Sequence, residues 1–256
     1  MNELVLARDA AHLAGGVAIK YYGKPLETIS KGGVDFYTKA DTEAENAARE
    51  LLKQHSKYPI FGEESGGDRD AKELWVVDAI DGTISHNSGL TSWASVVCLV
   101  DGDTAKVSAV YIPTAKEMYY AERGSGAMFR GYEAQPLPIK TTEEEDPTKL
   151  IVGFDLGYEG RGWKLDGVKS FAGDVRYPIA VGSASVGASL VAAGKLGAYI
   201  IWDVDINDTL PGALLVEEAG GCAVNERGEQ FTRNDRTLIA AGNEMIKGFI
   251  LGKIGE

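Results

Sequence analysis

The segment from Leu74 to Thr83 constrains the fold and chemistry of this chain more than any other. It opens with a run of apolar residues that favour a β-strand. The run ends in two carboxylates, Asp78 and Asp81, and is followed by Gly82 and Thr83. Carboxylates at a strand end suit hard cations, and the free N–H groups of a helix start suit a phosphate. The pattern therefore predicts metal and phosphate sites within one turn, which indicates phosphoryl chemistry.

Length, composition and charge limit the class of protein. A chain of 256 residues, 44% hydrophobic and 25% charged, can form a sizeable core as one large domain or two small ones. Its formal net charge of −12 argues against a nucleic-acid backbone or an anionic membrane as the main partner. So many carboxylates would also repel a phosphate, and divalent metals would remove that repulsion.

Neither a membrane span nor a signal peptide is expected. No apolar run is long enough to cross a bilayer, and the N-terminus lacks a basic start. Cys98 and Cys222 are far apart in apolar surroundings, which favours buried, reduced thiols. We therefore expect a cytoplasmic protein that does not associate with membranes.

Hydrophobic periodicity predicts a mixed α/β chain. Helices are expected at residues 2–22, 41–55, 162–171, 183–193, 211–219 and 244–252. Strands are expected at 58–62, 74–78, 93–100, 106–112, 117–122, 150–154, 175–181, 197–202, 222–225 and 237–241. A capping box of Thr42 and Glu45 should begin the second helix, and Pro211 should lie in the first turn of a later one. Strand–helix alternation beyond residue 150 indicates an α/β layered arrangement.

Acidic residues follow apolar runs at two further places. Glu63 and Glu64 follow one run, and Asp203, Asp205 and Asp208 follow another. A single such acid is more often a solvated charge or a helix cap, and Asp208 would suit the N-cap role. Three coincident cases, one beside an apparent phosphate site, instead favour a shared metal site.

Together these motifs resemble the inositol monophosphatase family over nearly the whole chain. The motifs that carry the resemblance are Glu63-Glu64, Asp78-x-Ile80-Asp81-Gly82-Thr83, Glu218-Ala219-Gly220-Gly221, and the segments 34–41, 182–185 and 238–243. The resemblance implies a sugar-phosphatase-type α-β-α-β-α sandwich. Archaeal-type members of the family, whose short loops are similar, act on inositol monophosphate and on fructose 1,6-bisphosphate.

The resemblance implies two or three Mg²⁺ ions. The residues that would bind the first two ions are Glu63, Asp78, Ile80 through its carbonyl, Asp81 and Asp208. Asp78 would bridge both ions, and Glu63 with Asp41 would reach a third, weaker ion. Such ions activate a water and stabilise the departing alkoxide without a covalent intermediate.

The remaining site residues would handle the substrate and the water. The N–H groups of Gly82 and Thr83 would hold the phosphate, and the turn of Gly182, Ser183 and Ala184 would contact the rest of the substrate. The resemblance implies that Glu64 and the Thr83 hydroxyl orient a water for in-line attack on phosphorus. We count Asp41 with these two catalytic residues.

Counting places the last metal ligand. The Trp202-Asp203 pair matches the family's usual Trp-Asp, but the family's aspartate lies ten residues before the glutamate of Glu-Ala-Gly-Gly. Ten residues before Glu218 is Asp208, so we assign the role to Asp208 and keep Asp203 and Asp205 as reserves.

Two departures from the family bear on specificity. Ala79 replaces the usual proline between the paired aspartates, and the family's inositol-binding glutamate falls near Ile201. Strict inositol specificity is therefore not expected, and adenosine 3′,5′-bisphosphate and NADP stay alternative substrates. The resemblance also implies a homodimer and inhibition by lithium.

Two other classes compete with this interpretation. A haloacid-dehalogenase-type phosphatase also uses an Asp–Gly–Thr motif, but its nucleophilic aspartate and general acid lie two residues apart, whereas Asp78 and Asp81 lie three apart. A non-catalytic metal-binding protein of the same fold is the second alternative, and the complete ligand set argues against it.

A proline- and acid-rich stretch, residues 135–149, is predicted to separate two halves. Residues 1–135 would form an N-terminal α+β half with the metal and phosphate motifs. Residues 136–256 would form a C-terminal α/β half with the substrate turn and the last metal ligand. The alternative is a surface connection inside one domain.

Three further residues are weaker candidates. His86 follows the phosphate motif and is a candidate for substrate contact, and Arg176 precedes the substrate turn and could contact a second phosphate or form a structural ion pair. Lys31 lies beside Gly32-Gly33, where family members keep a lysine near the third metal.

Overall fold

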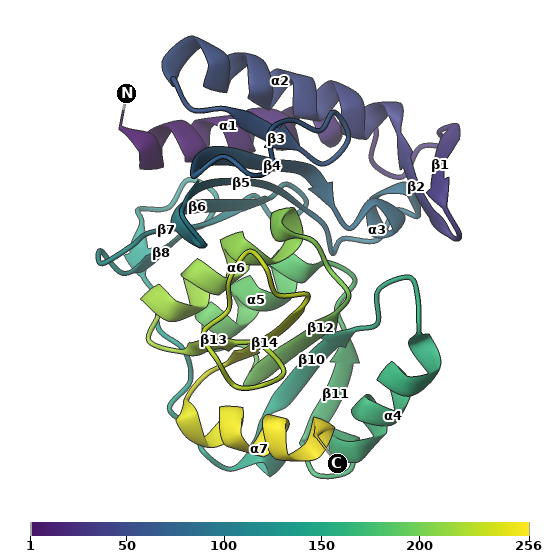
Figure 1. Cartoon of the computed structure of the whole chain (residues 1–256), viewed down its shortest axis with the longest axis vertical. Coiled ribbons are helices and arrows are strands. Elements are labelled where there is room, and N and C mark those ends of the chain that lie inside the picture. Colours follow the sequence, from purple (N-terminus) through teal and green to yellow (C-terminus); the bar gives the residue numbers. More distant parts are fainter. Residues whose placement is uncertain (1, 256) are drawn as a thin grey trace.

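The computed structural model describes residues 2–255 and shows five alternating layers of helix and sheet (Figure 1). Helices form the outer layers and the middle one, and the two larger sheets lie between them. From one side to the other the helices are α1 (Glu3–Ala18) with α2 (Lys39–His55), α5 (Ala184–Ala192) with α6 (Ile206–Glu218), and α4 (Arg161–Ala172) with α7 (Glu244–Ile254). The expected α-β-α-β-α sandwich is confirmed.

The larger sheet has seven strands and is mostly antiparallel. In spatial order they are β3 (Ile60–Gly62), β4 (Glu73–Asp81), β5 (Ala94–Asp101), β6 (Thr104–Ile112), β7 (Glu117–Glu122), β8 (Ala127–Arg130) and β9 (Leu137–Pro138). Because β3 and β4 run parallel, their carboxyl ends lie at the same edge. A separate hairpin of β1 (Thr28–Gly32) and β2 (Asp35–Thr38) precedes α2.

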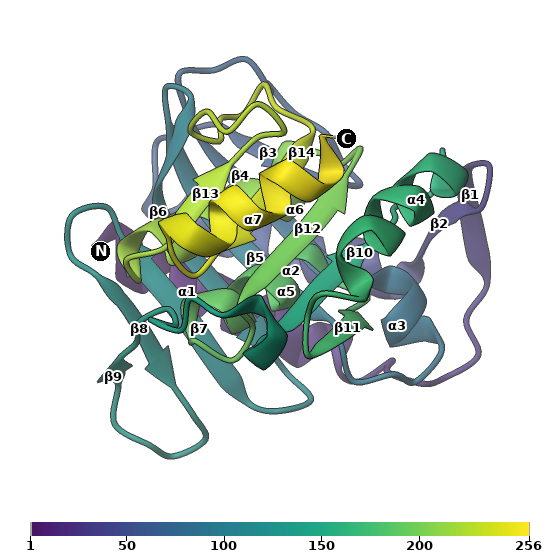
Figure 2. The same ribbon diagram turned by 90° about the horizontal axis from the view of Figure 1, so that it is seen from below.

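The smaller sheet has five strands, and α4 and α7 lie across it (Figure 2). Its order is β11 (Tyr177–Ala180), β10 (Ile151–Asp155), β12 (Ala198–Trp202), β14 (Thr237–Ala241) and β13 (Cys222–Val224). The first three strands are parallel, so β10 and β12 end at one edge. The chain between the two larger sheets includes a short 3₁₀ helix, η1 (Pro147–Lys149).

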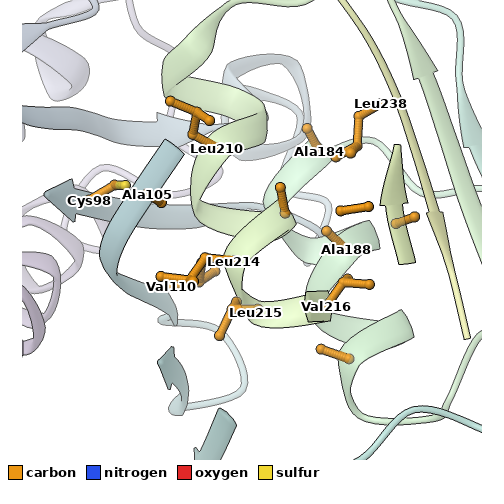
Figure 3. Packing of buried hydrophobic residues seen from close by; sticks show 14 of the residues in the cluster. Cys98, Ala105, Val110, Ala184, Ala188, Leu210, Leu214, Leu215, Val216 and Leu238 are labelled. Atoms are coloured by element: carbon orange, nitrogen blue, oxygen red, sulfur yellow. The ribbon is translucent and has the colours of Figure 1, made fainter. Parts of the chain in front are cut away.

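The middle layer carries the largest apolar cluster. Leu210, Leu214 and Leu215 of α6 are buried in the same cluster as Val110 of β6 and Ala188 of α5 (Figure 3). This cluster contains residues from both sides of residue 135, so the two larger sheets share one core around α5 and α6. The proposed division into two halves stays a prediction.

Two further findings concern cysteines and membranes. Cys98 is buried and Cys222 is half-buried, and both are free thiols. Within residues 2–255, every helix falls short of the length and apolarity that a bilayer span requires.

Two predicted helix starts are wrong. The helix expected at residue 41 begins at Lys39, and its capping box consists of Thr38 and Asp41 instead of Thr42 and Glu45. This start is preferred because two hydrogen bonds close the first turn. The Thr38 side chain accepts from the backbone N–H of Asp41, and the Asp41 side chain accepts from the backbone N–H of Thr38.

The helix expected at residue 211 begins at Ile206. Asp205 is its N-cap, so Asp208 is the third helical residue and Pro211 lies inside the helix beyond the first turn. The prediction placed the proline in the first turn because that is its commonest helical position. The Gly-Thr helix start is confirmed by α3 (Thr83–Asn87), whose N-cap is Gly82.

Candidate active site

A cleft of about 490 Å³ lies where the ends of several elements meet. Its walls come from the β1–β2 hairpin, the ends of β3 and β4, α3, the chain after β10, and the starts of α5 and α6. The predicted site residues that line it are Glu63, Asp78, Ile80, Asp81, Gly82, Thr83, Gly182, Ser183, Ala184 and Asp208. The other two, Asp41 and Glu64, lie behind this lining and bond to Thr83 and Lys31.

Three of the predicted metal ligands form one cluster. Glu63, Asp78 and Asp208 each offer a carboxylate oxygen, and these oxygens lie within 4.8 Å of one another. Parallel pairing of β3 with β4 brings Glu63 beside Asp78, and the first turn of α6 supplies Asp208. Segments far apart in sequence thus converge on one small volume.

A β-bulge lets Asp78 and Asp81 serve the same cleft. Asp78 lies opposite Val96 of β5 and Asp81 opposite Ala94, so three steps along β4 face two along β5. In a regular strand, residues three apart point to opposite faces. The extra residue of a bulge changes that alternation, and both carboxylates line the cleft.

Asp81 links the end of β4 to the start of α5. Its Oδ2 accepts hydrogen bonds from the Ser183 hydroxyl at 2.9 Å and the Ser185 N–H at 2.6 Å. Its Oδ1 accepts a third from the Ala184 N–H at 3.3 Å. Burial raises the pKa of Asp81, and these donors oppose that effect. The predicted substrate turn is therefore fixed directly to a predicted metal ligand.

The electrostatics of the cluster fit a divalent cation. Burial, followed by repulsion from Glu63, raises the pKa of both Asp78 and Asp208 well above the ordinary value. Asp78 accepts from the Ile80 N–H at 2.9 Å with Oδ1, whereas its buried Oδ2 has no hydrogen-bond partner. Crowded carboxylate oxygens with an unpaired, buried member are a suitable ligand set for Mg²⁺.

Lys31 of the β1–β2 hairpin neutralises part of this charge. Its Nζ lies 2.6 Å from Glu63 Oε1 and 2.5 Å from Glu64 Oε1. Burial lowers the pKa of Lys31, but the two glutamates outweigh burial and the net pKa is raised. Burial and the neighbouring Glu63 raise the pKa of Glu64 to about 7.

The Thr83 hydroxyl lies between two acceptors at the start of α3. Thr83 Oγ1 is 3.1 Å from Asp41 Oδ1 and 3.2 Å from the Ile80 carbonyl oxygen. The other oxygen of Asp41 accepts from the N–H and hydroxyl of Thr38, at 2.8 and 2.7 Å. Asp41 therefore orients the Thr83 side chain from behind.

Gly82 allows the end of β4 to approach the substrate turn closely. Its φ is +96°, and a Cβ there would lie only 2.8 Å from the Gly182 carbonyl oxygen. Both the backbone conformation and the close approach favour glycine.

One buried residue that the sequence interpretation missed supports Glu64. Glu45 of α2 accepts hydrogen bonds from the N–H groups of Glu64, at 2.8 Å, and Ser65, at 3.2 Å. A Cβ at Gly62 would clash with the Glu45 carboxylate, so the turn lies tightly against α2. The position of Glu45 four residues after Asp41, on the same helix face, was the available signal. Four cleft-lining residues that no motif indicated are Asp155, Tyr158, Arg161 and Arg236.

Two of the three weaker candidates, His86 and Arg176, lie outside the cleft lining. The buried His86 ring contacts the Ala18 carbonyl oxygen through Nε2 at 2.9 Å, stacks edge-on against Trp93, and is absent from the cleft lining. Arg176 is likewise absent from that lining. Asp205 caps α6 and pairs with Arg69, so its carboxylate is already engaged.

Asp203, the other reserve ligand, also has a partner. It lines the cleft and lies 2.7 Å from Lys164 Nζ. The carboxylate cluster thus contains Asp208 and neither reserve.

The layered sandwich, with carboxylates clustered at strand ends beside a Gly-Thr helix start, defines a protein of the sugar-phosphatase fold class. The chain belongs to the inositol monophosphatase family, because the profile described as "Inositol monophosphatase family" matches residues 2–256. This match favours the first of the two phosphatase families considered and supports activity on phosphate monoesters.

Relatives with different names are similar over nearly their whole lengths. Nus factor SuhB of Salmonella typhimurium is 31% identical, over 96% of this chain and 94% of its own. A fructose-1,6-bisphosphatase/inositol-1-monophosphatase of Aquifex aeolicus is 31% identical, over 97% and 93%. A histidinol-phosphatase of Chlorobaculum parvum is 30% identical, over 97% and 95%. Two of these names are those of phosphatases with different substrates, whereas Nus factor names no phosphatase activity.

A solved structure has the same fold. The extragenic suppressor protein suhB from Bartonella henselae superimposes with a TM-score of 0.89, at 26% identity, over 98% of each chain. The layer order is therefore that of known family structures.

Proposed function

We propose that this protein hydrolyses the phosphate monoester of a small sugar or polyol, inositol monophosphate or fructose 1,6-bisphosphate or both, with two or three Mg²⁺ ions. The observation that carries the proposal is the Glu63–Asp78–Asp208 cluster, with oxygens within 4.8 Å, in the same cleft as Gly82 and Thr83. Family membership supports the phosphatase class.

The chain provides ligands for the ions. The residues that would hold them are Glu63, Asp78, Ile80 through its carbonyl, Asp81 and Asp208, with Asp41 near a third ion. When bound, the ions would lower the pKa of the attacking water and stabilise the departing oxygen. Lys31 is paired with Glu63, so a bound cation would compete with the Lys31 ammonium group for that carboxylate.

Side chains in and behind the cleft lining would orient the water. The Thr83 hydroxyl donates toward Asp41 Oδ1 or the Ile80 carbonyl, which leaves its oxygen available to accept a hydrogen bond from water. Glu64, fixed through its own N–H by Glu45, would accept the second hydrogen of that water. The two acceptors together would aim the water at phosphorus.

The phosphate and the alcohol would occupy neighbouring walls. The N–H groups of Gly82 and Thr83 would hold the phosphate, and the Gly182, Ser183 and Ala184 turn would contact the alcohol. The homodimer, the cytoplasmic location, the inhibition by lithium and the lack of nucleic-acid binding stay predictions.

Phosphate release from a substrate panel tests this function. The panel comprises inositol 1-phosphate, fructose 1,6-bisphosphate, adenosine 3′,5′-bisphosphate, NADP and histidinol phosphate, each with Mg²⁺ and with a chelator. We expect Mg²⁺-dependent release that is fastest with one of the first two esters. Fastest release from another ester would make the substrate assignment wrong. Absence of release from all five would favour a non-catalytic metal-binding homologue.

A further inference from the structure

An acidic residue outside the metal cluster lines the wall on which the alcohol part of an ester would lie. Asp155 is the last residue of β10 and lies directly beside Ile201 of the parallel strand β12. Residues in register on neighbouring strands project to the same face, and both residues line the cleft. Since Ile201 is apolar, Asp155 is the acceptor on this stretch of wall.

Two donors hold the Asp155 carboxylate in place. The Gly182 N–H lies 2.8 Å from Oδ1 and 2.9 Å from Oδ2, and the Tyr199 hydroxyl lies 2.7 Å from Oδ2. An ionised carboxylate accepts about four hydrogen bonds, so two donors leave acceptor capacity on the cleft side. No lysine, arginine or histidine among residues 2–255 forms an ion pair with Asp155. The carboxylate is thus rigid, half-buried and not neutralised.

Asp155 lies one backbone segment away from the predicted phosphate position. It binds the Gly182 N–H, and the Gly182 carbonyl oxygen faces Gly82, where a Cβ would approach it to 2.8 Å. A phosphate at the Gly82 N–H would therefore lie close to the turn that Asp155 binds. The alcohol part of the ester would share the cleft with Asp155.

We propose that Asp155 is a specificity-determining residue that accepts hydrogen bonds from hydroxyl groups on the alcohol part of the ester. This inference rests on the proposed phosphatase function and selects hydroxyl-rich alcohols over aryl or simple alkyl ones. The competing role is purely positional, in which Asp155 only fixes the Gly182 turn.

Burial raises the pKa of Asp155 to about 6, and hydrogen bonds, the largest of them from Tyr199, limit the rise. The carboxylate is therefore mostly ionised at neutral pH and able to accept. Charge-assisted hydrogen bonds of this kind are stronger than neutral ones, which gives the residue a measurable share in discrimination.

The test compares two esters in the Mg²⁺-loaded enzyme. For Asp155→Asn, kcat/KM is measured with inositol 1-phosphate and with 4-nitrophenyl phosphate, which has no alcohol hydroxyl beyond the ester oxygen. We expect kcat/KM for the inositol ester to fall about 10-fold or more, mainly through KM, while that for the aryl ester stays within about twofold. An equal loss on both esters would show a positional role and overturn the inference.

Three controls make the result specific. Tyr199→Phe removes one supporting donor but keeps the carboxylate, so the ratio of the two kcat/KM values should stay near that of the parent. Asp101→Asn, at an exposed position at the end of β5, should change neither value.

If Asp155→Asn does not fold, Asp155→Glu retains the charge but displaces it. An altered ratio of the two kcat/KM values then supports the inference, and an unaltered ratio contradicts it. A parent enzyme that hydrolyses no ester overturns the proposed function as well, whereas hydrolysis with an unaltered ratio overturns only this inference.

Discussion

At the scale of single residues, the site gathers buried acids whose charged forms repel one another. Asp78 illustrates the conflict, because its Oδ2 is buried without a partner while Glu63 and Asp208 lie close by. A protein interior retains such an arrangement at a cost in stability, because unpaired buried carboxylates are strongly unfavourable. A bound cation removes both the repulsion and the unpaired acceptor.

Asp78→Asn separates the role of this residue in catalysis from its effect on folding. Loss of one anionic ligand oxygen should lower turnover at least about 1000-fold, because metal ions contribute several kcal/mol to such reactions. Without metal, removal of one repelling charge should raise the melting temperature by about 2–4 °C. The measurements are phosphate release with Mg²⁺ and thermal unfolding with a chelator. A folded variant that retained turnover would show that Asp78 is not a ligand.

At the scale of elements, the sequence predicts most helices and strands but not how they turn carboxylates inward. The helix start was recognised from Gly82-Thr83, and the acids at the ends of β3, β4 and β12 from carboxylates that follow apolar runs. The bulge between Asp78 and Asp81 could not, because it depends on pairing with Ala94 and Val96 of another strand. Hydrophobic periodicity indicates which face of a strand is apolar. A bulge shifts the alternation of side chains locally, with no change in composition.

The starts of α2 and α6 show a related limit. Thr38 and Thr42 are both plausible caps by type, and only the buried bonds of Asp41 to Thr38 decide between them. The contacts of Glu45 with Glu64 and of Asp155 with Gly182 join distant segments, so a local pattern does not identify the partners. Counting from Glu218 did place Asp208 in the cluster; its metal-binding role stays a prediction.

Close packing of α5 against α6 holds two parts of the site together, and Gly212→Ala tests it. A methyl group at Gly212 would clash with the Ala188 side chain, so the helices must move apart. Overpacking should cost about 1–3 kcal/mol and exceed the helix-propensity gain of alanine. We also expect weaker Mg²⁺ binding, because α6 carries Asp208, whereas α5 begins at the turn that holds Asp81.

A matched glycine provides the control for that variant. Gly248 of α7 has no atom within 4 Å of an added Cβ, so Gly248→Ala should stabilise the protein by about 0.5–1 kcal/mol and leave Mg²⁺ binding unchanged. Chemical denaturation and Mg²⁺ titration followed by thermal shift measure both effects. Equal stability changes in the two variants would refute the packing argument.

At the scale of the whole molecule, the layers place every acid of the cluster at the junction of the two larger sheets. The alternation of strands and helices predicts the layered class. The net charge of −12 predicts that divalent cations are needed to offset repulsion between the protein and a phosphate. The order of strands within each sheet was not predicted, since it depends on contacts between residues far apart in sequence. The stability of the molecule should therefore depend on how many of these buried acids are ionised.

Stability without metal should fall as the pH rises from about 4 to about 7 and above. The pKa of Glu64 is raised from 4.5 to about 7, and that of Asp155 from 3.8 to about 6. The pKa values of Asp78 and Asp208 are raised well above 3.8. Between the ordinary and the raised values the folded state binds more protons than the unfolded state, so the free energy of unfolding decreases with pH. Ions bind the deprotonated ligands, so stabilisation by Mg²⁺ should increase over the same range. The experiment is thermal unfolding at several pH values, with a chelator and with Mg²⁺. A chelated protein whose melting temperature rose through this range, or a Mg²⁺ shift that did not grow with pH, would mean that these acids are not the dominant buried charges of the fold.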